Sequence, residues 1–471
     1  MPEQAFSDAS PSAIAKAMED AWSCFGDFRG KPGLERGAFL RSIARNLEKD
    51  ADELLALADL ETSLGPDRLG FELTRTVTEL RSFAALADSG KWEEPRVEKA
   101  EPDRTPLPKP GMRTVNLPVG PVVVIGACNF PFAISVVGTD TASAMAVGCP
   151  VIVKAHPDHA GTCEALAEMV RSALEQTGMP AKAFQLLHGV DHAVTRALVE
   201  HPRTACVAFT GSLKGGHALM KIANGRSKPI PFHAEMGSLN PVFILPHALE
   251  HKGEELAEGY VAAVNLYAGQ MCTKPGLLAL IDGPGLNSFL ESVRKATWGT
   301  DPTDMLNRTV FEDFNAVTKD LMSSLELLAS KEDAPGQRSR PALCRIFQVK
   351  GLEYMENQDL RSEAFGPASI IVRCSDQEEL MQLARSMEGS LTATIHAHTD
   401  DASLAQALFP LIESRVGRFL WGGFPPGVIP SIATHHGGPW PATTDPRHTS
   451  IGLYGYRRFV RPVCRQGFPD D

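Results

Sequence analysis

The sequence predicts an α/β protein in which two blocks of parallel β-sheet, each covered by helices, follow an all-helical start. The chain has 471 residues, enough for two to four domains at about 150 residues each. Continuous apolar runs alternate with helical patterns in two successive regions, and strands buried on both faces are typical of parallel sheets. A composition of 43% hydrophobic and 22% charged residues is that of a globular protein.

The start of the chain is predicted to be helical. Apolar residues recur at helical spacing through residues 12–90, between charged positions. A stretch rich in proline and charge, residues 93–110, follows, and short β-branched runs begin after it. We therefore expect a boundary near Pro110.

The first sheet block is predicted from alternating strands and helices. One helix, residues 161–177, places Cys163, Leu166 and Val170 on one face. In such a sheet, ligands are expected at the C-terminal ends of the strands. The predicted elements, in chain order, are strand 122–125, loop 126–132, helix 133–147, strand 151–153, helix 161–177, strand 184–187 and strand 205–209.

The second block is predicted to extend from about Glu235 to Pro425. Its expected strands are 277–281, 369–372 and 391–395, with helix throughout 285–330. The segment 456–464 is predicted to be an extended strand with no helix after it. A terminal strand without a local partner often completes the sheet of another subunit, so a homodimer or homotetramer is expected.

Composition excludes several classes of protein. The net charge of −11, without any long basic run, argues against a nucleic-acid partner. The first residues show neither a secretory signal nor a transit peptide, so a cytoplasmic location is expected. Nine cysteines without a CxxC pair indicate reduced thiols and no structural zinc site. The uncharged stretch 114–139 is broken by proline and glycine and is therefore not a membrane span.

Three residues are candidates for catalysis. Cys272 lies in the polar, glycine-bearing loop 269–273, where a thiolate can meet a substrate, although most cysteines are simply buried. Glu235 ends an apolar run, either as a solvated strand end or as a partly desolvated general base with a raised pKa. Asn129 ends the first strand, either as a turn former or as an amide donor to an oxyanion.

Other polar motifs carry less information alone. Ser212 follows a strand and a glycine turn and is a sound helix N-cap, and such a helix start can receive a phosphate. His156 and His159 are three residues apart, but Pro157 between them and the lack of further ligands argue against a metal. His435 and His436 precede Gly-Gly-Pro and are interpreted as part of a loop.

Together these residues resemble the aldehyde dehydrogenase superfamily from about Ala21 to Cys464. Within it, residues 233–238 and 436–443 are most similar to an NADP-dependent branch. That branch contains 2-oxoglutarate semialdehyde (2,5-dioxopentanoate) dehydrogenases and a bacterial fatty aldehyde dehydrogenase. The motifs that carry the resemblance occur in family order: Asn129-Phe130-Pro131, Lys154 after a strand, Phe209-Thr210-Gly211-Ser212 with Gly216, Glu235-Met236-Gly237, Gly269-Gln270-x-Cys272-Thr273 and Glu363-x-Phe365-Gly366-Pro367.

The resemblance implies oxidation of an aldehyde to a carboxylic acid without a metal. Cys272 would attack the aldehyde, and the Asn129 amide and the Cys272 N–H would hold the oxyanion. Hydride transfer to a nicotinamide would leave a thioester, which water activated by Glu235 would hydrolyse. The expected substrate is 2,5-dioxopentanoate, and a medium- or long-chain fatty aldehyde is the alternative.

The resemblance also implies a cofactor site and a choice of cofactor. NAD-preferring relatives usually carry Glu three residues after the strand-end lysine, where it repels a 2′-phosphate. This chain has Pro157 there, beside Lys154 and His156, so NADP is expected, with NAD as the second option. The expected cofactor-binding residues are Lys154, His156, Gly211, Ser212, Gly216, Glu363 and Phe365.

The substrate wall is predicted less directly. Close relatives usually have Phe at Met271 and Asn at Lys274. Lys274 would either bind a substrate carboxylate or point to solvent. Aromatic side chains that could line an apolar tunnel, although most aromatics are core residues, are Phe132, Trp421, Phe424 and Trp440.

The resemblance divides the chain into an NADP-binding part, a catalytic thiol part and a small β oligomerisation arm. A non-catalytic relative acting as a binding or structural subunit is disfavoured because Cys272, Glu235 and Asn129 are all present. An acylating, coenzyme A-dependent enzyme is disfavoured because such enzymes generally lack the general-base Glu. The expected segments are 1–110 (helical lead-in of the Rossmann-like cofactor-binding domain), 111–121 (part of the oligomerisation hairpin), 122–234 (cofactor-binding domain), 235–425 (catalytic domain) and 426–471 (return to the cofactor domain and C-terminal oligomerisation strand).

Overall fold

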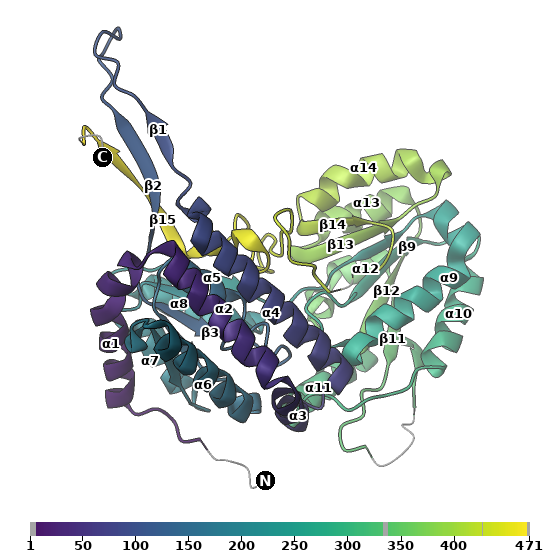
Figure 1. Ribbon diagram of the computed structural model, residues 1–471. Helices are drawn as coiled ribbons and strands as arrows, with labels where there is room; N and C mark the ends of the chain where they lie inside the picture. Colours follow the sequence, from purple (N-terminus) through teal and green to yellow (C-terminus); the bar gives the residue numbers. More distant parts are fainter. Residues whose placement is uncertain (1–5, 333–337, 426, 469–471) are drawn as a thin grey trace.

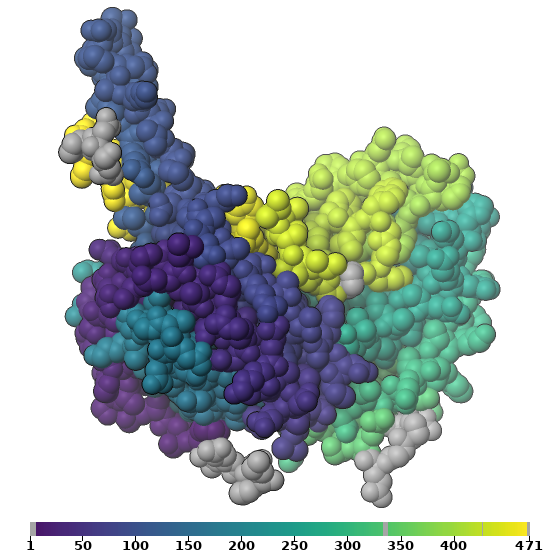
Figure 2. All heavy atoms as spheres, viewed as in Figure 1, coloured from purple at the N-terminus to yellow at the C-terminus, as the bar shows by residue number. Residues whose placement is uncertain are grey.

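Two α/β lobes and a projecting β arm make up the chain (Figure 1). A computed structural model describes residues 6–332, 338–425 and 427–468, so the parts of the predicted segments at 1–5, 333–337, 426 and 469–471 lie outside the described residues. Figure 2 shows the arm standing clear of both lobes. The predicted fold class, two parallel-sheet blocks with a small arm, is confirmed. Within the described ranges, no helix combines the length and apolar character needed to cross a membrane.

Helices form the start of the chain, as predicted. Ser10 caps the first helix, because its hydroxyl accepts a hydrogen bond from the Ala13 N–H at 3.2 Å. Phe39 and Leu40 of the second helix and Phe83 of the fourth are buried in one core. The four helices are α1 (Pro11–Gly30), α2 (Gly33–Lys49), α3 (Ala51–Thr62) and α4 (Pro66–Ser89).

The first sheet has five parallel strands in the order β5 (Phe184–Leu187), β4 (Val151–Lys154), β3 (Val122–Ile125), β6 (Cys206–Thr210) and β7 (Phe232–Glu235). Alternate residues of β3 face opposite sides: Val122 and Val124 join the core with α2, α4, α5 and α6, and Val123 and Ile125 join the core with α1, α7 and α8. The covering helices after β3 are α5 (Thr139–Ala146), α6 (Ala160–Thr177), α7 (His192–Glu200) and α8 (Leu213–Gly225).

The loop after β3 is longer than predicted, because α5 begins at Thr139 and not at Ala133. Glu72 of α4 holds this loop: its Oε1 accepts hydrogen bonds from the N–H groups of Phe132 (2.7 Å) and Ala133 (2.9 Å). The Thr139 N–H donates to the Ala133 carbonyl at 3.1 Å. A Cβ at Gly138 would lie 2.0 Å from that oxygen. The small residues here therefore permit close backbone packing rather than a helix.

The second sheet has seven strands in the order β10 (Glu326–Ser330), β11 (Arg345–Lys350), β12 (Ala368–Cys374), β9 (Leu277–Ile281), β8 (Val242–Ile244), β13 (Ser390–His396) and β14 (Val416–Trp421). All are parallel except β10, which pairs antiparallel with β11 at the edge. The three predicted strands are confirmed. The prediction of helix over 285–330 is confirmed at 286–298 and 308–324 but wrong at 299–307, which is not helical, and at its end, because the run 326–330 completes this edge.

Helices flank the second sheet on both faces (Figure 1). Six α-helices belong to this lobe: α9 (Pro246–Asn265), α10 (Leu286–Trp298), α11 (Arg308–Ser324), α12 (Gly351–Glu356), α13 (Gln377–Ser386) and α14 (Ala402–Glu413). Short 3-10 helices occur through the chain at η1 (Lys91–Glu93), η2 (Pro157–His159), η3 (Ala181–Ala183), η4 (Leu266–Gly269), η5 (Gln358–Arg361), η6 (Thr399–Asp401) and η7 (Leu453–Phe459).

The arm is a three-stranded antiparallel sheet of β1 (Arg96–Glu98), β2 (Met112–Pro118) and β15 (Val460–Gln466). The C-terminal strand begins later than predicted, because η7 occupies 453–459 and buries Tyr456 and Phe459 in the first lobe. The expectation that this strand lacks a local partner is wrong, since β15 pairs with β2 of the same chain over seven residues. The outer edge of β15 has no strand partner among the described residues.

Candidate functional site

Three segments from distant parts of the chain meet where the C-terminal edge of the first sheet faces the second lobe. They are the loop after β3, the end of β7 and the loop before β9. The Asn129 Nδ2 donates a hydrogen bond to the Gln270 carbonyl at 3.0 Å. His436 Nε2 lies 3.2 Å from Glu235 Oε1 and 3.5 Å from Cys272 Sγ. The structure therefore brings together all three predicted catalytic residues.

The loop that carries Cys272 has an unusual backbone. In η4, Tyr267 (φ 53°), Ala268 (φ 58°) and Gly269 (φ 65°) are consecutive left-handed residues. A non-glycine residue in this conformation costs about 1–3 kcal/mol and persists only when its surroundings hold it. A Cβ at Gly269 would lie 2.3 Å from the Gly366 carbonyl carbon, so glycine is required where this loop meets the 363–367 loop. The Cys272 loop is thus packed tightly against the predicted ribose-binding loop.

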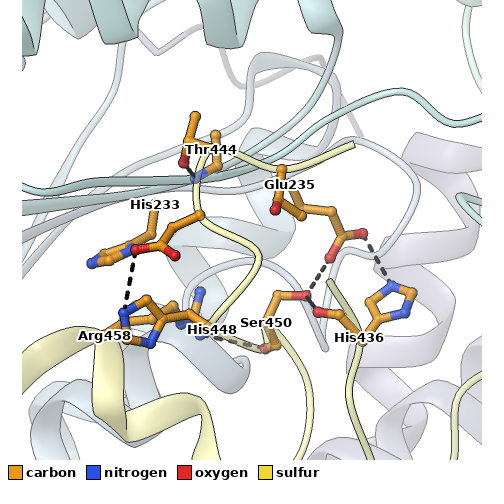
Figure 3. A pocket seen from close by; sticks show the side chains of 10 residues that line it. His233, Glu235, His436, Thr444, His448, Ser450 and Arg458 are labelled. Carbon is orange, nitrogen blue, oxygen red and sulfur yellow. Dashed lines mark hydrogen bonds and ion pairs between the residues drawn. The ribbon is translucent and has the colours of Figure 1, made fainter. Parts of the chain in front are cut away.

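Glu235 is buried at the end of β7 and is held from two sides (Figure 3). His436 contacts Oε1, and the Ser450 hydroxyl donates to Oε2. The Ser450 N–H donates to the His436 carbonyl at 2.8 Å, so these two residues form one unit around the carboxylate. The same polar cavity is lined by His233, His448 and Arg458, among others.

The ionisation of Glu235 and Cys272 differs from the prediction. Burial raises the pKa of the Glu235 carboxyl, but His436 and the hydrogen bonds from His436 and Ser450 outweigh it, so the pKa lies below its ordinary value. The predicted raised pKa is therefore wrong, because the carboxylate has donors that the sequence does not reveal. Burial and the nearby Glu235 charge hold the pKa of the half-buried Cys272 thiol well above its ordinary value.

The position of Asn129 depends on a buried ion pair on α4. Arg68 donates to the Asn129 carbonyl, and its Nη1 lies 3.6 Å from Glu72 Oε2. The guanidinium also lies over the rings of Phe130 (4.8 Å) and Tyr267 (5.1 Å). Since Glu72 binds the next N–H groups of the same loop, this pair holds the Asn129 loop against the Cys272 loop.

Lys274 is neither at the surface nor free for a substrate, which differs from both expectations. Lys274 is 3% exposed, and its Nζ donates to the carbonyls of Ala364 (3.0 Å) and Ala368 (2.7 Å). Burial lowers the pKa of the Lys274 ammonium to about 8. Lys274 therefore ties the Cys272 loop to the loop that contains Glu363.

Glu363 packs against the backbone after β7. A Cβ at Gly237 would lie 2.4 Å from Glu363 Oε2, so any larger residue there would require the Glu363 side chain to move. Burial raises the pKa of the Glu363 carboxyl to about 7, against the opposing effects of Lys274 and the Ser238 backbone. Phe365 lies two residues further along the same loop and is partly buried.

The residues predicted to bind the adenosine end lie at the C-terminal ends of β4 and β6, the two strands on either side of β3. Lys154 ends β4, is 8% exposed and has no hydrogen-bond or ion-pair partner within the described ranges. Ser212 caps α8, because its hydroxyl accepts from the Gly215 N–H at 3.2 Å, and the first turn of α8 is exposed. An unpaired ammonium near an open helix N-terminus fits a ligand that carries phosphate.

A neutral imidazole and two carboxylates, Asp8 and Asp158, surround Lys154. Burial, with His159 and Lys154, holds the pKa of His156 well below its ordinary value, so the imidazole is neutral. Asp158 Oδ2 lies 3.5 Å from His156 Nδ1 and accepts a hydrogen bond from Asn307 at 2.7 Å. Asp158 is a neighbour that the sequence argument did not consider.

Gly211 and Gly216 have a packing role of their own. A Cβ at Gly211 would lie 2.7 Å from the Phe209 ring, and one at Gly216 would lie 2.5 Å from Met236 Sδ. A larger residue at either position would therefore require Phe209 or Met236 to move, whether or not a ligand is bound.

The predicted wall residues are dispersed. Phe132 is fully buried in the first core. Phe424 packs on the rings of Tyr260 and His396. Trp421 is 61% exposed and contacts Phe409, and Trp440 is 47% exposed beside His217. None of these contacts joins them to the Cys272 loop.

Sequence reasoning missed several residues that shape the site. His436 was interpreted as part of a loop, and only its place in the 436–443 motif hinted otherwise. Arg75, also on α4, is a second basic residue: its Nε and Nη2 are buried without a hydrogen-bond partner among the described residues, and its charge lowers the pKa of Cys272. Arg68-x₃-Glu72 and Arg75-x₃-Glu79 were a detectable signal, because i,i+4 charge pairs on a helix rich in buried residues indicate buried ion pairs.

Comparison with known proteins agrees with this geometry. The model of a family described as the aldehyde dehydrogenase family matches residues 4–310. An alpha-ketoglutaric semialdehyde dehydrogenase 2 from Azospirillum brasilense is 42% identical over 470 residues, which covers 99% of this chain and 89% of the relative. An alpha-ketoglutaric semialdehyde dehydrogenase from Acinetobacter baylyi is 39% identical over 464 residues, covering 98% and 88%.

Solved structures show the same fold at lower identity. A 1-pyrroline-5-carboxylate dehydrogenase from Thermus with bound NAD superposes with a TM-score of 0.82 and 22% identity. The match covers 98% of this chain and 86% of that one.

Proposed function

This chain belongs to the aldehyde dehydrogenase family and is an NAD(P)-dependent aldehyde dehydrogenase, and from that premise we propose its substrate, its cofactor preference and the roles of its residues. The proposed reaction oxidises 2-oxoglutarate semialdehyde to the dicarboxylic acid with NADP. The observation that carries the mechanism is the contact of one imidazole nitrogen, His436 Nε2, with both Cys272 Sγ and Glu235 Oε1.

Cys272 is the proposed nucleophile, and it needs a base. Since its thiol pKa lies above the ordinary value, little thiolate is present at neutral pH before substrate binds. As sulfur attacks the aldehyde carbon, His436 Nε2 can pass the proton that it donates to the ionised Glu235, 3.2 Å from it, onto that carboxylate. The same nitrogen, 3.5 Å from Cys272 Sγ, is then free to accept the thiol proton. Attack thus forms a C–S bond and an oxyanion while the proton leaves the reacting centre.

Asn129 is the proposed oxyanion donor, with the Cys272 N–H. One N–H of its amide is held by the Gln270 carbonyl, two residues before the nucleophile, which fixes the amide beside the loop. The second N–H is then available to the oxyanion. Removing one such donor typically costs about 10²–10³ in kcat.

The cofactor would be held by Lys154 and the first turn of α8 at its adenosine end and by Glu363 at its nicotinamide ribose. When bound, the nicotinamide accepts the hydride that leaves the former aldehyde carbon. Lys274 keeps the Glu363 loop against the Cys272 loop through its bonds to Ala364 and Ala368. The buried Lys274 side chain thereby fixes the Glu363 loop, which would hold the cofactor, relative to the Cys272 loop, which carries the nucleophile.

Glu235 is the proposed base for release of the acid. After hydride transfer, Cys272 carries a thioester. Glu235 first loses to solvent the proton that it received when the thiol attacked. Water then adds to the thioester carbonyl while Glu235 takes a proton from the water, and the C–S bond breaks to release the acid and the Cys272 thiolate. A carboxylate whose pKa is lowered by His436 and Ser450 is ionised at neutral pH, which this step requires.

The 2-oxoglutarate semialdehyde proposal is supported by the names of two relatives, at 42% and 39% identity, and by Arg75. Its side chain is 10% exposed, and its nearest acid, Glu79 Oε1, is 3.6 Å from Nη2 without a hydrogen bond. Its charge reaches Cys272, so a substrate carboxylate there would complete its hydrogen bonds. Arg75 replaces Lys274 as the proposed partner of that carboxylate.

A comparison of substrates tests this assignment. The kcat/KM for 2-oxoglutarate semialdehyde should exceed that for hexanal. Arg75→Met should lower kcat/KM for 2-oxoglutarate semialdehyde by about 10- to 150-fold, because it removes a hydrogen bond to a charged group. It should leave kcat/KM for hexanal unchanged. Arg81→Met is the matched control, because Arg81 lies on the same helix in an exposed pair with Glu48. Preference for hexanal, or equal loss for both aldehydes in Arg75→Met, would refute the assignment.

NADP preference is proposed from Lys154, the neutral His156 and the proline at 157. Both nearby carboxylates already have hydrogen-bond partners: Asp158 accepts from Asn307, and Asp8 accepts from the N–H groups of Val190 and Asp191. Pro157→Glu should weaken NADP relative to NAD by about tenfold to a thousandfold, because a carboxylate about 4 Å from a phosphate costs about 1–4 kcal/mol. An unchanged ratio of kcat/KM for the two cofactors would place the 2′-phosphate elsewhere.

A further inference from the structure

A second group of chemically competent side chains lies on the outside of the second lobe, away from the catalytic loops. His247 and His251 are on the first part of α9, the teal helix on the outer side of that lobe (Figure 1). His398 and Asp400 come from the turn after β13, which forms η6. His247, His251 and Asp400 each offer a ligand atom, and these atoms lie within 4.8 Å of one another.

The spacing of the two helical histidines is that of a chelating pair. Residues four apart lie on the same face of a helix, one turn above the other, and two histidines at this spacing are a recurrent zinc-binding arrangement. The helix kinks only at Lys252, after both of them. The His251 ring centroid lies 4.6 Å from that of His398, and His398 Nδ1 lies 3.1 Å from Asp400 Oδ2.

The two segments that carry these side chains are joined rigidly by Asp401. Its carboxylate accepts hydrogen bonds from the N–H groups of His247 and Ala248 (3.0 Å each), at the start of α9. The same carboxylate accepts from the His398 N–H at 2.9 Å. Asp401 is 3% exposed, so one buried carboxylate sets the distance between the helix and the turn. The site is therefore built before any ligand arrives, and only exposed side chains need to rotate.

The charge around the cluster suits a cation. Asp400 is exposed, Glu250 Oε2 lies 3.9 Å from His247 Nδ1, and Asp401 lies beneath. Lys252 is the adjacent basic residue. The other such groups in the described chain are less open: Asp445 of the His233–His448 group is already bonded to Arg447, and Asp158 of the Cys128–His156 group is bonded to Asn307.

We propose that His247, His251 and Asp400 bind a divalent transition-metal ion of the zinc type, with His398 as an outer partner. Two neutral imidazoles and a carboxylate are ligands that Zn²⁺ accepts, and water would fill the remaining position. His398 is assigned the outer role because its Nδ1 already accepts from the Asp400 N–H at 3.3 Å, which orients Asp400. The site is independent of the proposed reaction and links α9 to the end of β13.

Zn²⁺ titrated into the full-length enzyme tests the site, with calorimetry and the thermal midpoint as readouts that do not depend on activity. Zn²⁺ should bind and raise the thermal midpoint. His251→Asn and Asp400→Asn should each weaken this binding at least about tenfold, since loss of even an outer partner costs about 10- to 100-fold. His192→Asn, which alters an exposed histidine on α7, is the matched control and should bind as wild type.

The active site offers a competing group, Glu235, Cys272 and His436, and must be distinguished. Cys272→Ser should retain the surface binding, and bound Co²⁺ should show no thiolate charge-transfer band from this site. Without added metal, His251→Asn should keep wild-type kcat. If His251→Asn and Asp400→Asn bind Zn²⁺ like wild type, or if Cys272→Ser alone abolishes binding, the proposal is wrong.

Discussion

His436 contacts both Cys272 and Glu235, although the sequence around it is that of an ordinary loop. It is fully buried, and its Nε2 reaches an acid on one side and a thiol on the other. A single nitrogen cannot donate to Glu235 and accept from Cys272 at the same moment. The proton on Nε2 must therefore move when the thiol ionises, which makes this residue sensitive to substitution.

His436→Asn should slow the pre-steady-state burst of reduced cofactor by about 10²-fold or more, the typical contribution of a general base. The burst rate should then rise with pH, because the thiol must ionise without help. His435→Asn, at the neighbouring half-buried histidine, is the control and should behave like wild type. A slow burst that does not respond to pH would indicate a structural role only.

The raised pKa of Cys272 predicts how the reaction of the free enzyme with alkylating reagents depends on pH. Thiolate is the reactive form, so inactivation by iodoacetamide should rise about tenfold per pH unit from pH 7 to 9 without a plateau. Glu235→Gln should shift this profile to lower pH, because the charge that raises the thiol pKa is gone. Mass spectrometry of the Cys272 peptide is the measurement. A plateau below pH 8 in wild type would contradict the raised pKa.

Helix α4 covers the first sheet and also holds the loop that carries Asn129. Its inner face carries Arg68, Glu72 and Glu79, all buried, among apolar side chains. Glu72 binds the loop after β3, and Glu79 Oε2 accepts from the Thr139 hydroxyl at 2.9 Å, at the start of α5. A helix from the first 90 residues thus holds the loop that presents Asn129 to the nucleophile.

Arg68→Met should destabilise the protein by about 3–5 kcal/mol, since it leaves the Glu72 carboxylate buried without its partner. It should also lower kcat, because the Asn129 carbonyl loses its donor. Arg68→Met with Glu72→Gln should recover part of the stability but not kcat. Urea unfolding and steady-state kinetics measure the two effects. Arg81→Met, in the exposed pair with Glu48, should cost less than about 1 kcal/mol.

Equal losses of stability in Arg68→Met and Arg81→Met would contradict this account of α4. So would a normal kcat in Arg68→Met, because Asn129 would then keep its place without the arginine.

The arm of the molecule has exposed apolar residues and, among the described residues, an unpaired strand edge, which the fold of a single chain does not explain. It projects from the first lobe and stands clear of both lobes (Figure 2). Val97 and Leu107 are 67% and 74% exposed, and the outer edge of β15 is unpaired in the described chain. Exposed apolar residues beside an open strand edge are typical of an interface. We therefore still expect a homo-oligomer, although β15 has its own partner in β2.

Val97→Glu with Leu107→Glu should lower the mass measured by light scattering to that of one chain, because charges would be buried at the interface. Leu60→Glu is the control, since Leu60 is 73% exposed on α3 in the body of the first lobe. A wild-type protein that is already monomeric, or a double variant with unchanged mass, would contradict the assembly.

The sequence by itself determined the elements and the chemistry of the main groups. Continuous apolar runs predicted the strands of the first sheet, because both faces of a parallel sheet are buried. Helical spacing predicted the buried face of α6, because burial of one face imposes that period locally. The motifs around Cys272 and Glu235 indicated a nucleophile and a base. Each of these residues lies in a turn or at a strand end, and the adjacent residues in the sequence determine that local structure. These features depend on residues close together in the chain.

Only the tertiary structure decided how those groups act. His436 lies 164 residues from Cys272 and 201 from Glu235, and its contacts with them reverse the predicted direction of the Glu235 pKa. Lys274 meets its carbonyl partners 90 and 94 residues away, so its burial could not be read from its neighbours. A pKa depends on every charge and donor within a few ångströms, and folding alone determines which distant residues supply them.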